Sequence, residues 1–184
     1  MVGAIFFDRD GTICEDLSVE EKERKILSKN DFKWLPMAKN ALELLVSIKI
    51  PLFIITNQSA INRGLLSVES FEEINELIYS EIEKLGGKII KTFYCPHLEY
   101  ENCVCRKPST FLIKRAEKEF EINLKESYVI GDQTSDIKMG EDVGSKTILV
   151  LTGFGGSDEK YRIDPKIKSK DLYEASLVIK NLEK

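Results

Sequence analysis

Two pairs of carboxylates follow apolar segments and define the chemistry that this chain can support. Asp8 ends the apolar segment 2–8, and Asp10 follows in FFDRDGT; Asp132 and Asp136 follow another apolar segment in GDQTSD. Three or four acids at one site repel one another unless a cation lies among them. Carboxylate oxygens with open coordination positions suit Mg²⁺, which keeps some of its waters and binds substrate phosphate.

Phosphoryl transfer is the reaction that fits these residue types. One carboxylate attacks phosphorus and forms an aspartyl-phosphate, while a second donates a proton to the leaving oxygen and then activates water. Gly11 and Thr12 offer backbone N–H groups to anionic oxygens. The hydroxyl of Thr56 and the ammonium of Lys107 can neutralise the charge that develops on the phosphoryl group. The simpler alternative to an active site is that the two acidic segments are unrelated turns. This alternative is disfavoured if both segments lie at strand ends.

The only histidine and three of the four cysteines fall within eleven positions of the chain. Cys95, His97, Cys103 and Cys105 form the pattern C-x-H-x5-C-x-C. Thiolates and imidazole are the usual ligands of zinc, and a Cys₃His set without a vacancy is typical of a structural site. Disulfides and a catalytic cysteine are alternatives. Disulfides are disfavoured in a cytosolic chain. A catalytic cysteine needs a basic partner, and His97 is the only histidine that could serve.

Zinc would order loop 95–105, which has little apolar area of its own. Arg106 and Lys107 follow Cys105 directly. The metal would therefore also set the direction of both cations, and we expect the loop to aim Arg106 and Lys107 at a phosphate group.

Short apolar segments rich in β-branched residues alternate with helical patterns along the chain. We expect strands at 2–8, 51–57, 88–95, 127–132 and 146–151, and helices at 38–49, 67–85, 108–120, 135–144 and 171–184. Such alternation produces a parallel sheet with right-handed crossovers. The prediction is an α/β, Rossmann-like three-layer sandwich with a central parallel sheet, in a single domain that spans residues 1–184.

Ligands of such sheets bind beyond the carboxyl ends of the strands. Those ends carry DRDGT, TNQS, the cysteine loop and GDQTSD, so these four polar segments should meet at one edge. The most charged stretch, 14–30, is interpreted as a solvated flap or helix. The chain between Asp8 and Thr56 is long enough for a helix and a flap but hardly for a large cap domain, so we expect an open site.

The composition excludes several other classes of protein. Of the 184 residues, 42% are hydrophobic and 32% are charged, as in soluble globular domains. A net charge of −4 gives no electrostatic case for binding nucleic acid. The apolar segments are too short to span a membrane, and the start MVGAIFFDRDG lacks the features of a signal peptide. We expect a cytoplasmic monomer whose partner is a small phosphorylated metabolite.

The segments DRDGT, TNQS, CRKP and GDQTSD, in this order and spacing, resemble the haloacid dehalogenase superfamily of phosphatases over residues 4–152. The resemblance is strongest to its zinc-containing branch, the D-glycero-D-manno-heptose 1,7-bisphosphate phosphatases and histidinol-phosphate phosphatases. It implies that Asp8 is the nucleophile and Asp10 the general acid/base. It also implies that Asp8, the backbone carbonyl of Asp10, and Asp132 hold Mg²⁺.

Further site residues come from the same resemblance. Thr56 and Lys107 would stabilise the phosphoryl group, and Arg106 would recognise the substrate. The segment TNQSAINRG is similar to TNQSGIARG of the heptose enzymes, with Ala60 in place of the glycine. The implied substrate contacts are Asp16, Asn57, Gln58, Ser59, Arg63, Arg106 and Gln133, of which Gln133 stands where a lysine is common.

The resemblance leaves three possible functions open. The leading expectation is removal of the C7 phosphate of the heptose bisphosphate to give heptose 1-phosphate. Histidinol-phosphate hydrolysis is the alternative within the enzyme class. An inactive, zinc-stapled binding module is the alternative outside it.

Overall fold

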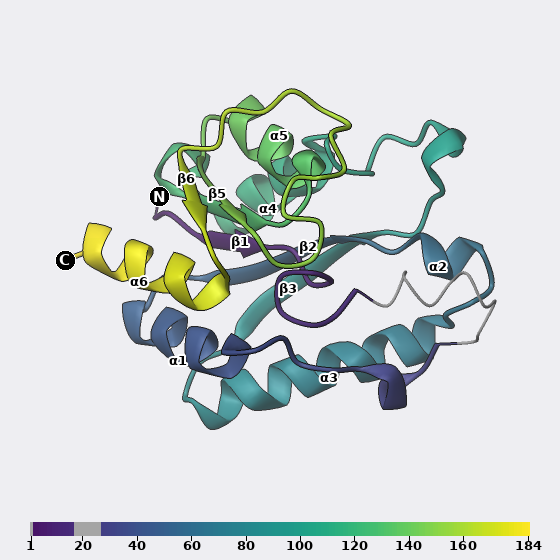
Figure 1. Ribbon diagram of the computed structural model, residues 1–184, viewed down its shortest axis with the longest axis horizontal. Helices are drawn as coiled ribbons and strands as arrows, with labels where there is room; N and C mark the ends of the chain where they lie inside the picture. Colours follow the sequence, from purple (N-terminus) through teal and green to yellow (C-terminus); the bar gives the residue numbers. More distant parts are fainter. Residues whose placement is uncertain (1, 17–26) are drawn as a thin grey trace.

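The computed structural model describes residues 2–16 and 27–184, and these contain one sheet of six parallel strands. The strands are β1 Ile5–Phe7, β2 Leu52–Asn57, β3 Ile89–Cys95, β4 Tyr128–Gly131, β5 Lys146–Val150 and β6 Ile167–Ser169, in the spatial order β3-β2-β1-β4-β5-β6. The α-helices are α1 Ala38–Ile48, α2 Ser59–Asn62, α3 Val68–Lys84, α4 Phe111–Phe120, α5 Thr134–Asp142 and α6 Leu172–Leu182. The predicted α/β architecture with a parallel sheet is confirmed (Figure 1).

Helices cover both faces of the sheet, and for that reason the strands carry apolar residues on both sides. In β1, Ile5 and Phe7 belong to one core and Phe6 to the other. Helices α1, α3 and α6 pack on the face of Ile5 and Phe7, and α4 and α5 pack on the opposite face (Figure 1). The sheet is thus a rigid middle layer, and its carboxyl edge gives the loops a fixed base.

Helix α3 follows the predicted amphipathic pattern with one exception. The Ser67 side chain caps it by accepting a hydrogen bond from the Ser70 N–H at 3.0 Å. The buried face carries Phe71, Ile74, Ile78 and Ile82. Asn75 is also fully buried on this helix. Its place in an apolar stripe indicates a polar partner, which lies in the active site.

The structure differs from the expected elements at three places. Strand β6 and helix α2 were not predicted, because three residues and a single turn are too short to show a clear period. Helix α4 was expected to begin at Pro108 but begins at Phe111. The reason is that Asn57 Oδ1 accepts the backbone N–H of Lys107 at 3.0 Å, which holds this part of the loop against the end of β2.

No capping domain occurs among the described residues between β1 and β2, which form a short 3-10 helix (Lys29–Asp31) and α1. The prediction of a flap or helix at 14–30 falls mostly on residues 17–26, which lie outside the described residues. None of the helices in the described part of the chain combines the length and apolar character that a membrane span requires.

Candidate active site

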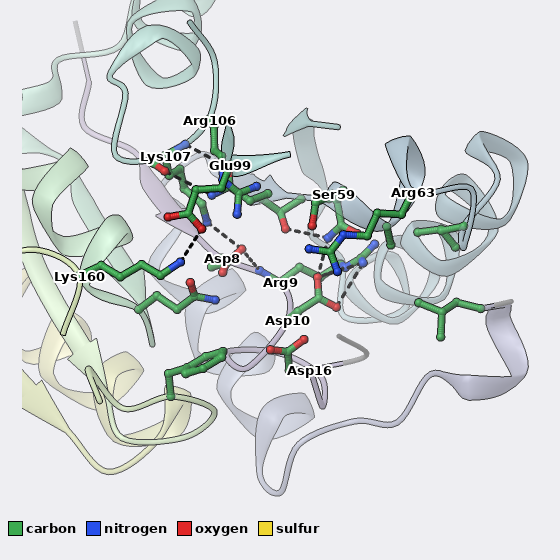
Figure 2. Close-up of a pocket in the computed structure, with 18 residues that line it drawn as sticks. Asp8, Arg9, Asp10, Asp16, Ser59, Arg63, Glu99, Arg106, Lys107 and Lys160 are labelled. Atoms are coloured by element: carbon green, nitrogen blue, oxygen red, sulfur yellow. Dashed lines mark hydrogen bonds and ion pairs between the residues drawn. The ribbon is translucent and has the colours of Figure 1, made fainter. Parts of the chain in front are cut away.

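A pocket of about 210 Å³ lies at the carboxyl edge of the sheet, where the ends of β1 and β2 meet the loop that follows β3 (Figure 2). The structure places most predicted site residues on its wall: Asp8, Asp10, Asp16, Thr56, Asn57, Gln58, Ser59, Arg63, Arg106, Lys107 and Gln133. Asp132 does not line the pocket. It is fully buried, and its carboxylate lies in one cluster with those of Asp8 and Asp136. The predicted convergence of four polar segments is therefore observed.

Lys107 is the central cation of this site, and its side chain is only 2% exposed. Its ammonium lies 2.9 Å from Asp8 Oδ1 and 2.5 Å from Asp136 Oδ1, and it donates to the carbonyl of Ile55 at 2.8 Å. Burial alone would lower the pKa of Lys107, but the charges of Asp136 and Asp8 outweigh it and raise the pKa above its ordinary value. These carboxylates thus favour the charged form of Lys107, whose ammonium lies beside the predicted nucleophile Asp8.

The acidic cluster behind the pocket has the composition of a site for a hard cation. The oxygens of Asp8, Asp132 and Asp136 that can serve as ligands all lie within 4.8 Å of one another. Burial, with help from the neighbouring carboxylates, raises the pKa values of Asp132 and Asp136 against the opposing charge of Lys107. Oδ1 of Asp132 is buried without a hydrogen-bond partner, whereas its Oδ2 accepts the Phe154 N–H at 2.8 Å. An unpaired buried oxygen among repelling carboxylates fits Mg²⁺.

Arg9 is a residue that the sequence reasoning missed. Its side chain is 1% exposed, and it donates to both carboxylate oxygens of Asp10, through Nε at 3.1 Å and Nη2 at 3.2 Å. Nη1 donates to Asn75 Oδ1 at 3.2 Å, and the guanidinium lies over the ring of Phe71. The signal in the sequence was Asn75, a polar residue in the buried stripe of α3. Arg9 holds the Asp10 carboxyl group in place.

The segment TNQ joins the two halves of the site. Gln58 Nε2 donates to Asp10 Oδ2 at 2.5 Å and to Thr56 Oγ1 at 2.9 Å. Asn57 accepts the backbone N–H of Lys107. Because Thr56 Oγ1 accepts from Gln58, its own proton remains available for a ligand in the pocket. These contacts assign to Asn57 and Gln58 a positioning role in addition to their place on the wall.

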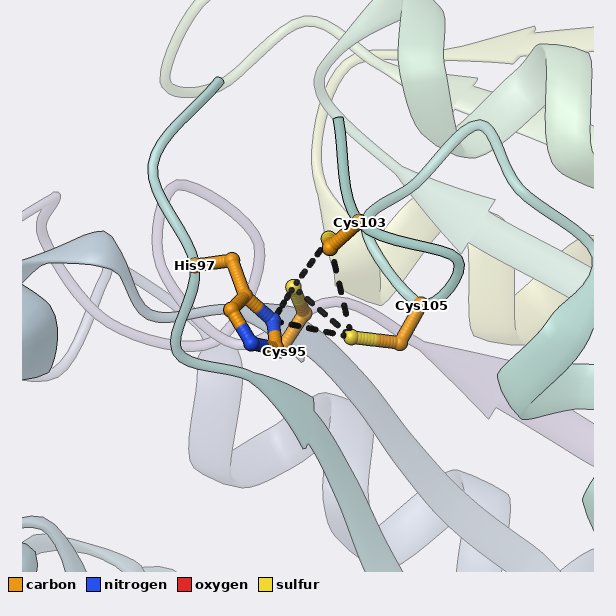
Figure 3. A group of neighbouring side chains, drawn as sticks. All are labelled: Cys95, His97, Cys103 and Cys105. Carbon is orange, nitrogen blue, oxygen red and sulfur yellow. Dashed lines mark hydrogen bonds between the residues drawn. The ribbon is translucent and has the colours of Figure 1, made fainter. Parts of the chain in front are cut away.

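Four potential ligand atoms meet in the loop after β3 (Figure 3). His97 Nδ1 lies 3.5 Å from Cys95 Sγ and 3.2 Å from Cys105 Sγ, and Cys103 Sγ lies 3.5 Å from Cys95 Sγ. All four cysteines of the chain are free thiols, because the sulfur atoms are much farther apart than the roughly 2.05 Å of a disulfide. The convergence of the four ligand atoms fits a closed zinc site.

The loop between β5 and β6 forms another part of the pocket wall. Gly153 has a φ of +55°, and a Cβ atom there would lie 2.2 Å from Asp132 Oδ2, so only glycine fits. Phe154 and Lys160 line the pocket, and Lys160 meets Glu99 of the cysteine loop at 2.7 Å. This segment is therefore part of the rim of the pocket.

Comparison with known proteins agrees with this geometry. The model of the HAD-hydrolase-like family matches residues 104–175. D-glycero-beta-D-manno-heptose-1,7-bisphosphate 7-phosphatase of Helicobacter pylori (strain 26695) is 39% identical over 80% of this chain and 83% of its own. D-glycero-D-manno-heptose-1,7-bisphosphate 7-phosphatase of Chlorobaculum tepidum is 31% identical over 93% and 90%.

A solved structure shows the same fold. The D,D-heptose 1,7-bisphosphate phosphatase of B. bronchiseptica, complexed with magnesium and phosphate, superposes with a TM-score of 0.87 at 23% identity and covers 98% of this chain and 99% of its own. The fold and the site together define a phosphatase with a Rossmann-like α/β fold and an aspartate at the end of the first strand. The chain belongs to the haloacid dehalogenase-like hydrolases, in the branch that contains the heptose bisphosphate 7-phosphatases.

Replacing Arg9 should destabilise the fold as well as the site. Arg9→Met should lower the free energy of unfolding by about 3–5 kcal/mol, the usual cost of removing one partner of a buried ion pair. Arg115→Met is the control, because Arg115 is 56% exposed where it meets Glu119 on the surface; it should change the free energy by at most about 1 kcal/mol. Urea denaturation measures both, and equal effects would contradict the role of Arg9.

Mg²⁺ should stabilise the metal-free protein against heat, by about 2.7 kcal/mol at a concentration one hundred times the dissociation constant. Since the pKa values of Asp132 and Asp136 are raised, protons compete with the cation, and the affinity should fall as the pH is lowered. Asp132→Asn should remove the stabilisation. Asp142→Asn, on the exposed side of α5, should retain it. An Asp132→Asn protein that Mg²⁺ still stabilises fully would rule out this site.

Proposed function

We propose that the protein removes the C7 phosphate of D-glycero-D-manno-heptose 1,7-bisphosphate and releases heptose 1-phosphate, through an aspartyl-phosphate on Asp8. The observation that carries the proposal is the buried ammonium of Lys107, which lies 2.9 Å from Asp8 Oδ1 at the base of an open polar pocket. Arg106 and Arg63 on the wall of this pocket suit a substrate with a second phosphate. The curated relatives carry the name of this activity.

In the first step, a carboxylate oxygen of Asp8 forms a bond to phosphorus while the bond from phosphorus to the C7 oxygen breaks. Asp10 gives its proton to that leaving oxygen, which completes the alcohol of the product sugar. Arg9 and Gln58 hold the Asp10 carboxyl group beside the reacting phosphate. The phosphoryl group is thereby transferred to Asp8, and the sugar departs with the C7 oxygen.

In the second step, Asp10 takes a proton from water, and the water oxygen attacks phosphorus. The bond between phosphorus and Asp8 then breaks, which releases inorganic phosphate and restores the Asp8 carboxylate. Thr56 Oγ1 and Lys107 Nζ donate to the phosphoryl oxygens while negative charge builds on them. When bound by Asp8, Asp132 and the backbone carbonyl of Asp10, Mg²⁺ would supply the remaining positive charge.

Asp136 takes a different role from the other acids. It pairs with Lys107 at 2.5 Å and caps its own helix by accepting the Gln133 N–H at 3.1 Å. Asp136 therefore aims the lysine, in addition to lying within the cation cluster.

The zinc loop, the extent of the domain and the location of the protein are included in this proposal. Zinc held by Cys95, His97, Cys103 and Cys105 would have a structural role and would order the loop that presents Arg106 and Lys107. Residues 1–184 would form one catalytic domain with the zinc loop at 95–105. The free thiols favour a cytoplasmic location. The oligomeric state stays a prediction, that of a monomer.

The test of the proposed function compares phosphate release from the heptose bisphosphate, from histidinol phosphate and from p-nitrophenyl phosphate, all with Mg²⁺ present. The bisphosphate should have the highest kcat/KM. Asp8→Asn should abolish turnover, and Asp10→Asn should reduce kcat by about 10²–10⁴ because the proton donor is lost. Preference for histidinol phosphate would replace the proposed substrate, and normal turnover by Asp8→Asn would reject the aspartyl-phosphate.

Removal of one zinc ligand should weaken catalysis without unfolding the sheet, since Cys95 is the one core residue of loop 95–105 and Cys103 and Cys105 are only partly buried against that core. Cys103→Ser should lose zinc, reduce kcat and raise KM, because Arg106 and Lys107 lose their common support. Val104→Ser is the matched control, since Val104 lies between two ligands and is 69% exposed. Elemental analysis, steady-state kinetics and circular dichroism give the three readouts. Unchanged kinetics after zinc loss would show that the metal does not position these cations.

A further inference from the structure

An ion pair closes part of the pocket mouth between two loops that come from opposite halves of the sheet. Glu99 begins the 3-10 helix Glu99–Glu101 in the cysteine loop after β3. Lys160 belongs to the segment between β5 and β6. Glu99 Oε2 lies 2.7 Å from Lys160 Nζ, and both residues line the pocket (Figure 2). Neither residue takes part in the reaction described above.

The charges of the pocket divide into a deep group and a rim group. In the deep group, Lys107 is paired with Asp8 and Asp136, and Arg9 is paired with Asp10. These pairs are buried and serve the transfer of the phosphoryl group.

In the rim group, the Glu99 carboxylate faces Lys160 and lies within the electrostatic influence of Arg106. The hydrogen bond from Lys160, and then the charges of Lys160 and Arg106, lower the pKa of Glu99 against the opposing effect of burial. The guanidinium of Arg106 is itself held by the cysteine loop, because Nη1 donates to the carbonyl of His97 at 3.1 Å. Glu99 therefore puts one negative charge where two cations meet at the mouth of the pocket.

The ion pair between Glu99 and Lys160 is weak enough for a ligand to replace the Glu99 carboxylate. The side chains of Lys160 and Glu99 are 47% and 61% exposed, and ion pairs with that much solvent contribute little to stability. A phosphate dianion carries more charge than one carboxylate and offers more acceptor oxygens. It can therefore take the place of Glu99 beside Lys160 at small cost, whereas a neutral hydroxyl group cannot.

We propose that Lys160, together with Arg106, binds the phosphate that is not hydrolysed. In the absence of substrate Glu99 forms an ion pair with Lys160, and this phosphate displaces the Glu99 carboxylate when the substrate binds. The proposal rests on the proposed function, since it assumes a substrate with two phosphates. Lys160 is then a specificity-determining residue, and Glu99 is a competing internal anion. The ion pair favours bisphosphates over monophosphates, because only a second phosphate forms an interaction with Lys160 that offsets the loss of its ion pair with Glu99.

The experiment measures kcat and KM for wild type, Lys160→Met, Glu99→Gln and the double variant. The substrates are two matched pairs: the heptose bisphosphate with heptose 7-phosphate, and fructose 1,6-bisphosphate with fructose 6-phosphate. Lys160→Met should raise KM for the heptose bisphosphate about tenfold, as for the loss of one charge-assisted hydrogen bond, and leave kcat within about twofold. Glu99→Gln should lower this KM about two- to fivefold, and by less when Lys160 is already methionine. KM for the monophosphates should hardly change.

Lys118→Met is the matched control, because Lys118 is an exposed lysine of α4 that does not line the pocket. It should leave all four substrates unaffected. The inference is overturned if Lys160→Met changes KM for bisphosphate and monophosphate alike, or changes neither.

Failure of the proposed function has a different signature. In that case wild type does not prefer the heptose bisphosphate over fructose 1,6-bisphosphate, yet the ratio of bisphosphate to monophosphate activity still depends on Lys160. A wild type without any bisphosphate preference on either sugar overturns both.

Discussion

The ion pair between Lys107 and the carboxylates of Asp8 and Asp136 is the interaction on which the rest of the site depends. The ammonium forms ion pairs with two carboxylate oxygens and donates a hydrogen bond to the carbonyl of Ile55. Without Lys107, two buried acids would stand beside Asp132 with no cation to balance them. Several contacts exist to keep this lysine in place. Asn57 binds its backbone, the cysteine loop ends directly before it, and the first turn of α5 supplies Asp136.

Two loops complete the pocket, and each is attached to the catalytic residues. The segment between β5 and β6 is also attached to α5, because Asp158 accepts the Thr134 N–H at 2.9 Å. The cysteine loop after β3 leads into Arg106 and Lys107, and zinc would stiffen it at that point. The segment between β5 and β6 is held by the Phe154 N–H on Asp132 and by the Thr152 hydroxyl, which donates to the carbonyl of Gly11 at 2.6 Å. The deep charges thereby serve phosphoryl transfer, while the exposed charges at the rim are free to select the substrate.

Most of the fold was predictable, because each long element carries a clear local signal of its own. Helix α3 has an amphipathic stripe, whereas the buried strands β2 and β5 are short continuous apolar segments. The failures have local causes. Strand β6 is a three-residue edge strand, Ile167–Ser169, with an exposed lysine in its middle. The start of α4 was displaced from Pro108 to Phe111 because a side chain of β2 binds the backbone just before it. A contact between segments fifty residues apart leaves no mark on local periodicity.

The sequence by itself determined the chemistry, because chemistry depends on residue type at strand ends. Asp8, Asp10 and Asp132 follow from that rule, whereas Lys107 and the C-x-H-x5-C-x-C cluster follow from residue types and their spacing in the loop after β3. Only the tertiary structure decided the partners of these groups. It buried Arg9 against Asp10 and Asn75, turned Asp136 toward Lys107, and brought Lys160 to Glu99, sixty-one residues away. The physical reason is that an ion pair forms where folded loops approach one another, and the approach of two loops is set by the packing of the sheet and helices between them.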